Sequence, residues 1–396
     1  MNKVGSPSNP QPTNVYNNAR RSNHLSEYTI LNATLIAITD GSKLFPEKRR
    51  SVKDETAVDL NRQIPKDFIS QYRHRKYNNL DLQINHIVHS GIEKFSIYGG
   101  VIGPQFGHAI TQSLGRLWVA SRFPNAEILF APANDRVMQI PSYFIQLLSY
   151  LGINNPIRLV NQDTWIPNLV VPRDICNIDK RPCVTKEFLN WITLRRPYVA
   201  IDNDVSLYIS RSAMPLHSGQ FLQETLIEDI LRGAGYTVVH PEKISIAEQA
   251  LLYAQAKRII FADGSACHLW SLFAQQGQSV GIILRRPINR YLNRWFKSMN
   301  IVRPAFMNFV LANLHESEVP NYYKSVALLD IESLWEGLRD LNFHNSPGGP
   351  TSPSAHLTAL ISAVSTSGNC APLDCLDERS CALIEKRRFM SLVDPN

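Results

Sequence analysis

Residues 258–275 read RIIFADGSACHLWSLFAQ, and they contain the unit from which the fold is built. The first five residues are mostly apolar and either β-branched or aromatic, which predicts a buried strand over 258–262. The Asp-Gly-Ser sequence at 263–265 is typical of a tight turn, and the apolar run after it predicts a helix over 266–275. The stretch therefore predicts a strand, a glycine turn and a helix in direct succession.

The same succession extends along the C-terminal half of the chain. Strands that alternate with helices of this length predict an α/β fold, in which helices cover both faces of a parallel sheet. The expected strands are 205–209, 236–239, 258–262 and 279–284, and the expected helices are 222–231, 246–256, 266–275 and a final amphipathic helix at 331–341.

The first half of the chain repeats this pattern. Ile110, Leu114, Leu117 and Trp118 have the spacing of one apolar helix face. The expected strands here are 95–101, 127–130 and 157–160, and the expected helices are 107–121 and 141–151.

A proline-containing stretch at 161–200 separates the two patterns and is expected to be irregular. We therefore predict an N-terminal α/β domain over 25–180 and a C-terminal α/β domain over 181–344, two Rossmann-like domains that face a cleft. The polar residues 1–24 predict a disordered leader, and residues 345–396 predict a flexible low-complexity tail.

Composition gives expectations about the location of the protein. The first 24 residues lack the apolar segment of a secretion signal, and no run of 18 apolar residues occurs. We expect a cytoplasmic protein whose six cysteines are free thiols. The basic clusters at 49–50 and 73–76 indicate either a solvated basic face or contact with a partner. The partner could be the anionic cytoplasmic face of the inner membrane, a pyrophosphate-linked acceptor or nucleic acid.

Sequence signatures of metal and cofactor sites are absent. There is no Walker motif, no GxGxxG after a strand, no HExxH and no GxSxG. The nearest approach to a DxD motif is Asp202-Asn203-Asp204, which precedes a strand and is expected to be a turn. The tail cysteines Cys370, Cys375 and Cys381 lack the CxxC spacing of zinc sites. We expect no metal and no bound cofactor.

Three helix or strand ends carry residues suited to a ligand, because ligands bind at the carboxyl ends of parallel strands. Arg211, after Ser210 and the strand 205–209, has a guanidinium that fits a phosphate; the alternative is a surface salt bridge. Residues 263–265 and the next helical N–H groups fit a diphosphate; the alternative is an ordinary helix cap. His108 opens a helix, where a neutral imidazole is favoured as a base; the alternative is a structural histidine.

These motifs together resemble glycosyltransferase family 61 of bacterial polysaccharide biosynthesis. The order and spacing of the motifs over residues 95–285 carry the resemblance, and Asp263 and Gln112 depart from residues that are common in the family. The matching motifs are Gly107-His108 with Arg116-Leu117 in the same helix, Ser210-Arg211, Gln223-Glu224, the segment 245–249 and Gly264-Ser265-Ala266-Cys267-His268.

The resemblance implies a GT-B fold and inverting, metal-independent transfer of a sugar from a nucleotide-sugar donor to a growing polysaccharide or a lipid-linked acceptor. Its C-terminal domain would bind the nucleotide, and His268 would add charge near the diphosphate. Glu224 would bind a hydroxyl or anchor Arg211, and Asp263, if it is not the base, would orient the donor sugar. The implied roles are catalytic for His108 and Asp263 as alternative bases, donor-binding for Ser210, Arg211, Glu224, Gly264, Ser265 and His268, and acceptor-side or supporting for Gln112, Arg116 and Gln249.

Three other interpretations stay open. A catalytically inactive GT-B scaffold of a polysaccharide-synthesis complex is favoured by the departures at Asp263 and Gln112. A polysaccharide pyruvyltransferase would share the two-domain architecture but consume phosphoenolpyruvate. Nucleic-acid binding would follow from the sequence pI of about 9.0, but the basic clusters lack interleaved aromatic residues, so no nucleic-acid partner is expected.

Overall fold

The computed structural model describes residues 95–346 with breaks at 134–135, 162–163, 179–180, 197, 216–217, 223, 287–289 and 316–323, and the strand residues 28–35, 57–59, 88–89 and 390–392. The predicted leader, the basic clusters at 49–50 and 73–76, Gln223, the three tail cysteines and nearly all of the predicted tail lie outside the described residues. Cys176, Cys183 and Cys267 are free thiols, as expected.

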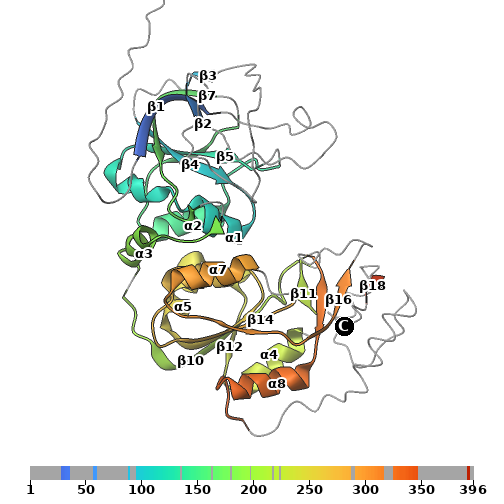
Figure 1. Cartoon of the computed structure of the whole chain (residues 1–396). Helices are drawn as coiled ribbons and strands as arrows, with labels where there is room; N and C mark the ends of the chain where they lie inside the picture. Colours follow the sequence, from blue (N-terminus) through green and yellow to red (C-terminus); the bar gives the residue numbers. More distant parts are fainter. Residues whose placement is uncertain are drawn as a thin grey trace, which may run out of the picture.

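A mixed sheet forms the part of the molecule at the top of Figure 1. Its strand order is β2-β1-β7-β4-β5-β6, with β3 also beside β7; β1 runs antiparallel to both β2 and β7, and the remaining pairs are parallel. The predicted strands at 95–101, 127–130 and 157–160 are confirmed. The strands are β1 (Tyr28–Leu35), β2 (Ala57–Asp59), β3 (Val88–His89), β4 (Ser96–Ile102), β5 (Glu127–Pro132), β6 (Ile157–Leu159) and β7 (Thr164–Pro172).

The strand β7 lies in the stretch that was expected to be irregular, so this prediction is wrong. Pro167 suggested a loop because proline cannot donate a hydrogen bond to a sheet. The register shift of β7 against β1 falls at this proline, since Leu31 pairs with Leu169 and Ala33 with Ile166. A bulge accommodates a proline within a strand, and the sequence pattern does not show it.

The single helix expected over 107–121 is also wrong in detail. The chain forms the short α1 (Phe106–His108), a π-helical turn (Ala109–Ser113) and a 3-10 helix (Leu117–Arg122). A Cβ atom on Gly115 would lie 2.1 Å from Asp174 Oδ1, so the segment after β7 packs directly onto the backbone there. This close approach separates the π-helical turn from the 3-10 helix. The next helix, α2 (Ser142–Tyr150), is confirmed.

The second sheet has five strands, all parallel, in the order β12-β10-β13-β14-β15. The predicted strands and helices of this half are confirmed, but Asp202-Asn203-Asp204 begins β10 and does not form the expected turn. The elements are β10 (Asp202–Ile209), α4 (Glu224–Gly233), β12 (Thr237–Val239), a 3-10 turn (Pro241–Lys243), α5 (Ile246–Gln255), β13 (Ala256–Ala262), α6 (Ala266–Phe273), β14 (Ser279–Ile283), α7 (Arg290–Met299) and β15 (Ala305–Met307).

Smaller elements complete the described part of the chain. A sheet in the order β11-β17-β16-β18 was not predicted, and the helix expected at 331–341 is confirmed as α8. These elements are β8 (Asn177–Ile178), β9 (Arg181–Pro182), α3 (Lys186–Thr193), β11 (Gln220–Phe221), β16 (Val310–His315), β17 (Val326–Leu329), α8 (Ile331–Asp340) and β18 (Met390–Leu392). Within the described residues, no helix has the length and apolar character needed to cross a membrane.

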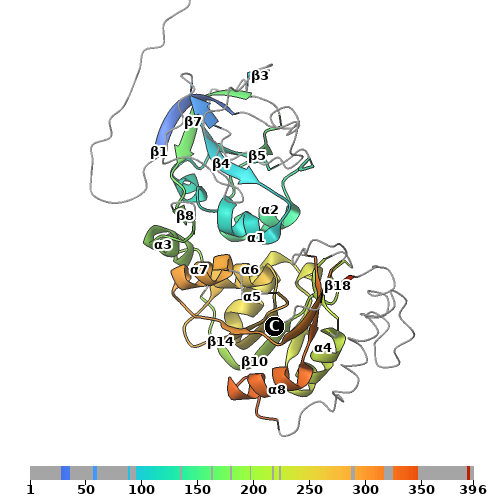
Figure 2. The ribbon, with the colours of Figure 1, turned by 45° about the vertical axis from the view of Figure 1, so that its right-hand side comes forward.

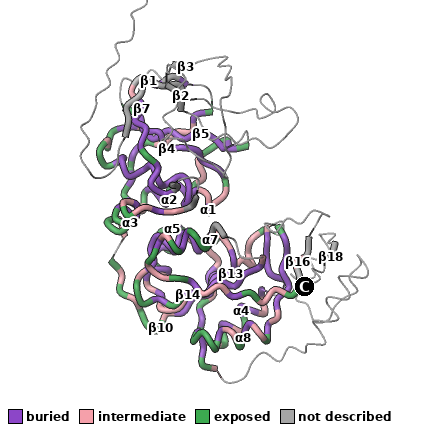
Figure 3. Tube along the Cα trace, viewed as in Figure 1, coloured by how far each residue is buried: buried purple, intermediate pink, exposed green. Residues whose placement is uncertain are grey.

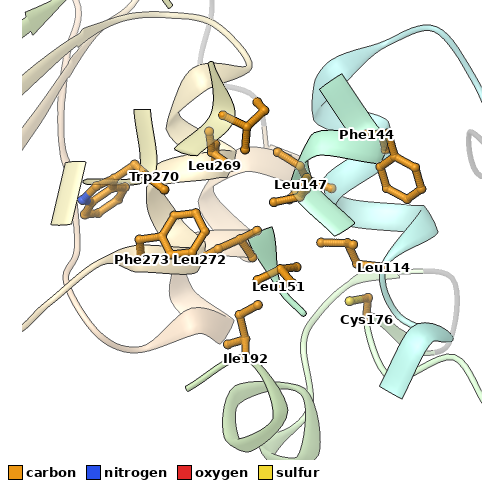
Figure 4. Close-up of a cluster of buried hydrophobic side chains, with 14 of the residues drawn as sticks. Leu114, Phe144, Leu147, Leu151, Cys176, Ile192, Leu269, Trp270, Leu272 and Phe273 are labelled. Carbon is orange, nitrogen blue, oxygen red and sulfur yellow. The ribbon is translucent and has the colours of Figure 1, made fainter. Parts of the chain in front are cut away.

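One hydrophobic core connects the helices of the first sheet with those of the second. The helices α1 and α2 lie on the side of the first sheet that faces α5 and α6 (Figure 2). Leu147 of α2 and Leu151, which follows its last residue, lie near Leu272 and Phe273 of α6 (Figure 4). The Tyr150 and Phe273 rings meet edge to face at 5.4 Å. Buried residues run through both sheets and the helices between them (Figure 3).

Replacing Gly115, at the break between the π-helical turn and the 3-10 helix, is expected to destabilise the protein. A Gly115→Ala variant places Cβ 2.1 Å from Asp174 Oδ1 and 2.9 Å from the Cys176 backbone nitrogen, so the backbone must move. We expect the free energy of unfolding to fall by about 1–3 kcal/mol in urea titrations. The control is Gly233→Ala at the end of α4, where no atom lies within 4 Å, and which should raise stability by about 0.4–1 kcal/mol. Equal effects of the two substitutions would contradict this account.

Candidate functional site

The site is built at the point where the second sheet changes its winding direction. From β10 the chain passes through α4 to β12 at one edge, whereas from β13 it passes through α6 to β14 on the other side. The strands β10 and β13 are neighbours, so their carboxyl ends lie side by side with no connection crossing between them. In open α/β sheets, ligands bind at such a switch point. The predicted residues Ser210-Arg211 and Asp263-Gly264-Ser265 follow these two strand ends.

Arg211 lies directly against the backbone of Gly264. A Cβ atom on Gly264 would be only 2.4 Å from Arg211 Nη1 and 3.2 Å from its Cδ, so only glycine leaves room for this guanidinium. Arg211 Nε donates a hydrogen bond to the Gly219 carbonyl at 3.0 Å, which fixes the side chain further. Arg211 forms no ion pair with any residue that the structure describes. A positive charge is thus held beside the start of α6, and no carboxylate in the described part of the chain forms an ion pair with it.

Glu224 anchors the turn that carries Arg211. Its fully buried Oε1 accepts a hydrogen bond from the Arg211 backbone N–H at 2.5 Å and another from the Tyr208 hydroxyl at 3.3 Å. Burial, reinforced by the charge of Glu224, raises the pKa of Tyr208 well above its ordinary value, so this hydroxyl remains a donor. Of the two roles open for Glu224, the geometry favours anchoring Arg211 over binding a hydroxyl of the donor.

Ser210 is engaged inside the protein. Its hydroxyl is fully buried and donates to Glu228 Oε1 at 2.6 Å, and Ser212 Oγ donates to the same oxygen at 2.5 Å. Burial raises the pKa of Glu228, but the bonds from Ser210, Ser212 and Arg232 outweigh this effect and hold the pKa below its ordinary value. Ser210 therefore supports the turn, and its hydroxyl is directed to Glu228 inside the protein, which does not favour contact with a sugar-nucleotide donor.

Asp263 forms a bidentate ion pair that the sequence pattern does not predict. Arg286 Nε donates to its Oδ2 at 2.9 Å, and Arg286 Nη2 donates to its Oδ1 at 3.2 Å. Burial raises the pKa of Asp263, but Arg286, Arg285 and Arg211 outweigh it and hold the pKa below its ordinary value. A carboxylate in this state is a poor proton acceptor, so the geometry disfavours Asp263 as the base.

Arg285 and Arg286 were missed in the sequence. Both directly follow the strand expected at 279–284, which is the same signal that pointed to Arg211 after its strand. Arg285 is buried, and its Nε donates to the Asp263 carbonyl at 3.2 Å. Burial lowers the pKa of Arg285 to about 9.

The starts of α1 and α6 meet at this site. A Cβ atom on Gly107 would lie 2.9 Å from His268 Cδ2 and 3.2 Å from Ser265 Oγ. Ser265 occupies the N-cap of α6, but its side chain makes no capping hydrogen bond. His108, which follows Gly107, is close enough to His268 for its charge to act on that ring. The predicted acceptor-side helix therefore touches the predicted donor-side turn.

His268 is a buried, neutral imidazole. Its ring stacks on Phe296 with centroids 6.3 Å apart and meets the edge of Trp295 at 6.1 Å. Burial, reinforced by the charges of His108 and Arg286, lowers the pKa of His268 to about 3. The geometry therefore does not support the expectation that His268 adds positive charge near a diphosphate.

The predicted supporting residues bind backbone groups of the scaffold. Arg116 is fully buried, its Nη1 donates to the Pro172 carbonyl and its guanidinium lies 5.3 Å from the centre of the Tyr98 ring. Gln249 Nε2 donates to the Pro241 carbonyl at 2.8 Å. These contacts fix the end of β7 and the 3-10 turn after β12, which is a supporting role.

Gln112 lies in the π-helical turn. Its side chain is buried, and its Oε1 has no hydrogen-bond partner among the described residues. Turns of this kind often mark functional positions in helices. As for metals, the described part of the chain contains no group of three or more His, Cys, Asp or Glu side chains arranged to hold an ion.

The buried neutral state of His268 predicts a pH-dependent stability. Its pKa of about 3 in the folded state lies below the ordinary value of about 6.5 in the unfolded chain. The unfolded chain therefore binds a proton first, and the stability that this group contributes above pH 6.5 is lost as the pH falls from 6.5 toward 3. Through this group the wild type should lose about 2 kcal/mol between pH 7 and pH 5 in urea titrations. His268→Gln does not titrate at this position, so its free energy of unfolding should fall less between pH 7 and pH 5. If the variant and the wild type lose the same amount, the buried neutral state of His268 is not the cause.

A comparison with known protein families finds a match that covers most of the residues described above. The Glycosyltransferase 61 family model matches residues 106–281, from α1 into β14. The matched region contains Gly107-His108, the Arg211–Gly264 contact and the start of α6. A search of the curated proteins finds no match to the chain. The family match indicates glycosyltransferase activity, with a sugar donor and an acceptor as substrates. Over residues 106–281, the chain is therefore similar to glycosyltransferase family 61.

Proposed function

We propose that this chain is an inverting, metal-independent glycosyltransferase that uses a nucleotide-sugar donor. One observation carries the proposal: the guanidinium of Arg211 is held over Gly264, without an ion-pair partner among the described residues, at the switch point of a parallel sheet. A cation in that position fits the diphosphate of a nucleotide sugar.

The donor side combines Arg211 with the N-terminal end of α6. The first N–H groups of a helix point outward and favour anions, and Ser265 leaves them without a side-chain cap. During transfer, negative charge develops on the departing diphosphate. Arg211 and these N–H groups stabilise this charge in place of a metal ion.

The acceptor side provides the base, for which we propose His108. The contact of Gly107 with Ser265 and His268 brings His108 next to the donor turn, whereas Asp263 is held in its pair with Arg286. His108 takes the proton of the acceptor hydroxyl as the oxygen forms its bond to the anomeric carbon. The bond to the diphosphate oxygen breaks on the opposite side, so the configuration inverts.

We further propose a GT-B division of the chain, with the acceptor in a domain over 25–180 and the nucleotide in a domain over 181–344. All strands of the first sheet come from residues 28–172, and all strands of the second come from 202–307, which supports a boundary between them. We propose a growing polysaccharide or a lipid-linked saccharide as the acceptor, used at the cytoplasmic face of the membrane.

Arg211→Ala is expected to abolish donor binding without unfolding the protein. With chelator present, the nucleoside diphosphate that the wild type prefers should add about 2.7 kcal/mol of stability at 100 times its Kd. Arg211→Ala should lose this stabilisation and at least about 100-fold in transfer rate. The control is Arg158→Ala, which breaks the pair with Glu127 at the first sheet. Full binding and turnover by Arg211→Ala would exclude this donor site.

His108→Gln is expected to separate chemistry from donor binding. Because the base acts on the acceptor, kcat should fall by about 10²–10⁴ while nucleoside diphosphate affinity stays at the wild-type value. Initial rates and titration calorimetry measure the two quantities. An unchanged kcat would mean that another group takes the proton.

A further inference from the structure

Two arginines that the proposed function leaves without a role lie at the same sheet edge as Arg211. Arg285 and Arg286 follow β14, which pairs in parallel with β13, so these residues emerge at the carboxyl ends of the strands. The side chain of Arg286 is 15% exposed, and that of its partner Asp263 is 3% exposed. Part of the Arg286 side chain therefore reaches the surface, although the carboxylate behind it does not.

Three guanidinium groups converge on two residues between β13 and α6. Arg211 lies against the α-carbon of Gly264, Arg285 Nε donates to the Asp263 carbonyl and Arg286 binds the Asp263 carboxylate through two nitrogens. The charges of all three arginines act on Asp263. These contacts attach three cations to the short segment that begins α6.

Two described carboxylates, those of Asp263 and Glu224, lie at this turn with the three cations. The Asp263 carboxylate binds Arg286, and the charges of all three arginines act on it, whereas Glu224, also close to Arg285, accepts a hydrogen bond from the backbone N–H of Arg211. The partly positive end of α6 lies beside these cations. Several guanidinium groups next to a helix start fit an anion that carries more than one charge.

Resting on the proposed donor site, we propose that Arg286 binds the diphosphate of the donor opposite Arg211 and that Asp263 is the positioning residue that orients Arg286. Arg286 donates to both carboxylate oxygens of Asp263, through Nε and Nη2, and two bonds fix the plane of its guanidinium. A single hydrogen bond would leave the guanidinium free to rotate. Arg285 fixes the backbone of Asp263 from the other side. Asp263 thus acts through Arg286 and is not the base.

The experiment measures how much each phosphate adds to nucleotide affinity in the full chain. Uridine, UMP and UDP, and the same guanosine series, are titrated by calorimetry into the wild type, Arg286→Gln and Arg286→Lys. Arg286→Gln should lose about tenfold or more in nucleoside diphosphate affinity and nothing in nucleoside affinity. Arg286→Lys keeps the positive charge but cannot donate two parallel hydrogen bonds, so its nucleoside diphosphate affinity should lie between those of the wild type and Arg286→Gln. If Arg286→Gln does not fold, Arg286→Lys provides the test.

Arg158→Gln is the matched control, because Arg158 also pairs with a carboxylate through Nε and Nη2, on the first sheet. It should keep wild-type nucleotide affinities. If Arg211→Ala loses diphosphate affinity and Arg286→Gln does not, this inference fails and the proposed donor site stands. If the wild type binds no nucleotide, both fail.

A double-mutant cycle tests the role of Asp263. If Asp263 positions Arg286, Asp263→Asn changes diphosphate affinity when Arg286 is present and has no further effect in Arg286→Gln. Equal effects in both backgrounds would overturn the positioning role. A fall in kcat at unchanged diphosphate affinity would identify Asp263 as a base and overturn it as well.

Discussion

The missing side chain at Gly264 is the constraint on which the candidate site depends. A Cβ atom there would lie 2.4 Å from Arg211 Nη1, so the guanidinium keeps this position beside the start of α6 only while residue 264 has no side chain. The remaining contacts hold the two partners in that relation. Glu224 binds the backbone of Arg211, Gly219 accepts from its Nε, and Arg285 binds the backbone one residue before the glycine. The site is therefore an arrangement of fixed cations and backbone dipoles, the kind that stabilises charge without rearranging.

A second glycine contact joins the proposed acceptor side to the proposed donor side. Gly107 fits against Ser265 and His268, and the core between α2 and α6 continues the same interface behind it. His268 fills space there as a neutral ring between Gly107 and Phe296. In this arrangement, the residues that face the proposed acceptor are positioned by contacts with the proposed donor side. Packing between helices therefore sets the position of the proposed acceptor side relative to the proposed donor side, whereas the polar networks lie within the proposed donor side.

Most of the second sheet could be predicted from the sequence, because each strand there is a short apolar run that ends in polar or glycine residues. The positions of Arg211, Gly264 and Ser265 at strand ends followed from the same pattern. The bulge at Pro167 and the break at Gly115 could not be predicted, since both depend on partners far along the chain. The pair between Asp263 and Arg286 was missed for a similar reason: it joins the ends of two strands that become neighbours only in the folded sheet. Asp263 alone therefore looked like a candidate base.

The pairing of β1 with β7 has a consequence for how the chain folds as it is synthesised. Tyr28 pairs with Pro172, so the first strand has no partner on this side until almost the entire first half of the chain has left the ribosome. At ordinary translation rates this interval is on the order of ten seconds. The second sheet, by contrast, adds each strand beside one made shortly before. Contacts that close over such a distance in sequence form slowly, so the completion of the first sheet is the step at which nascent chains of this protein are exposed to aggregation and to chaperones.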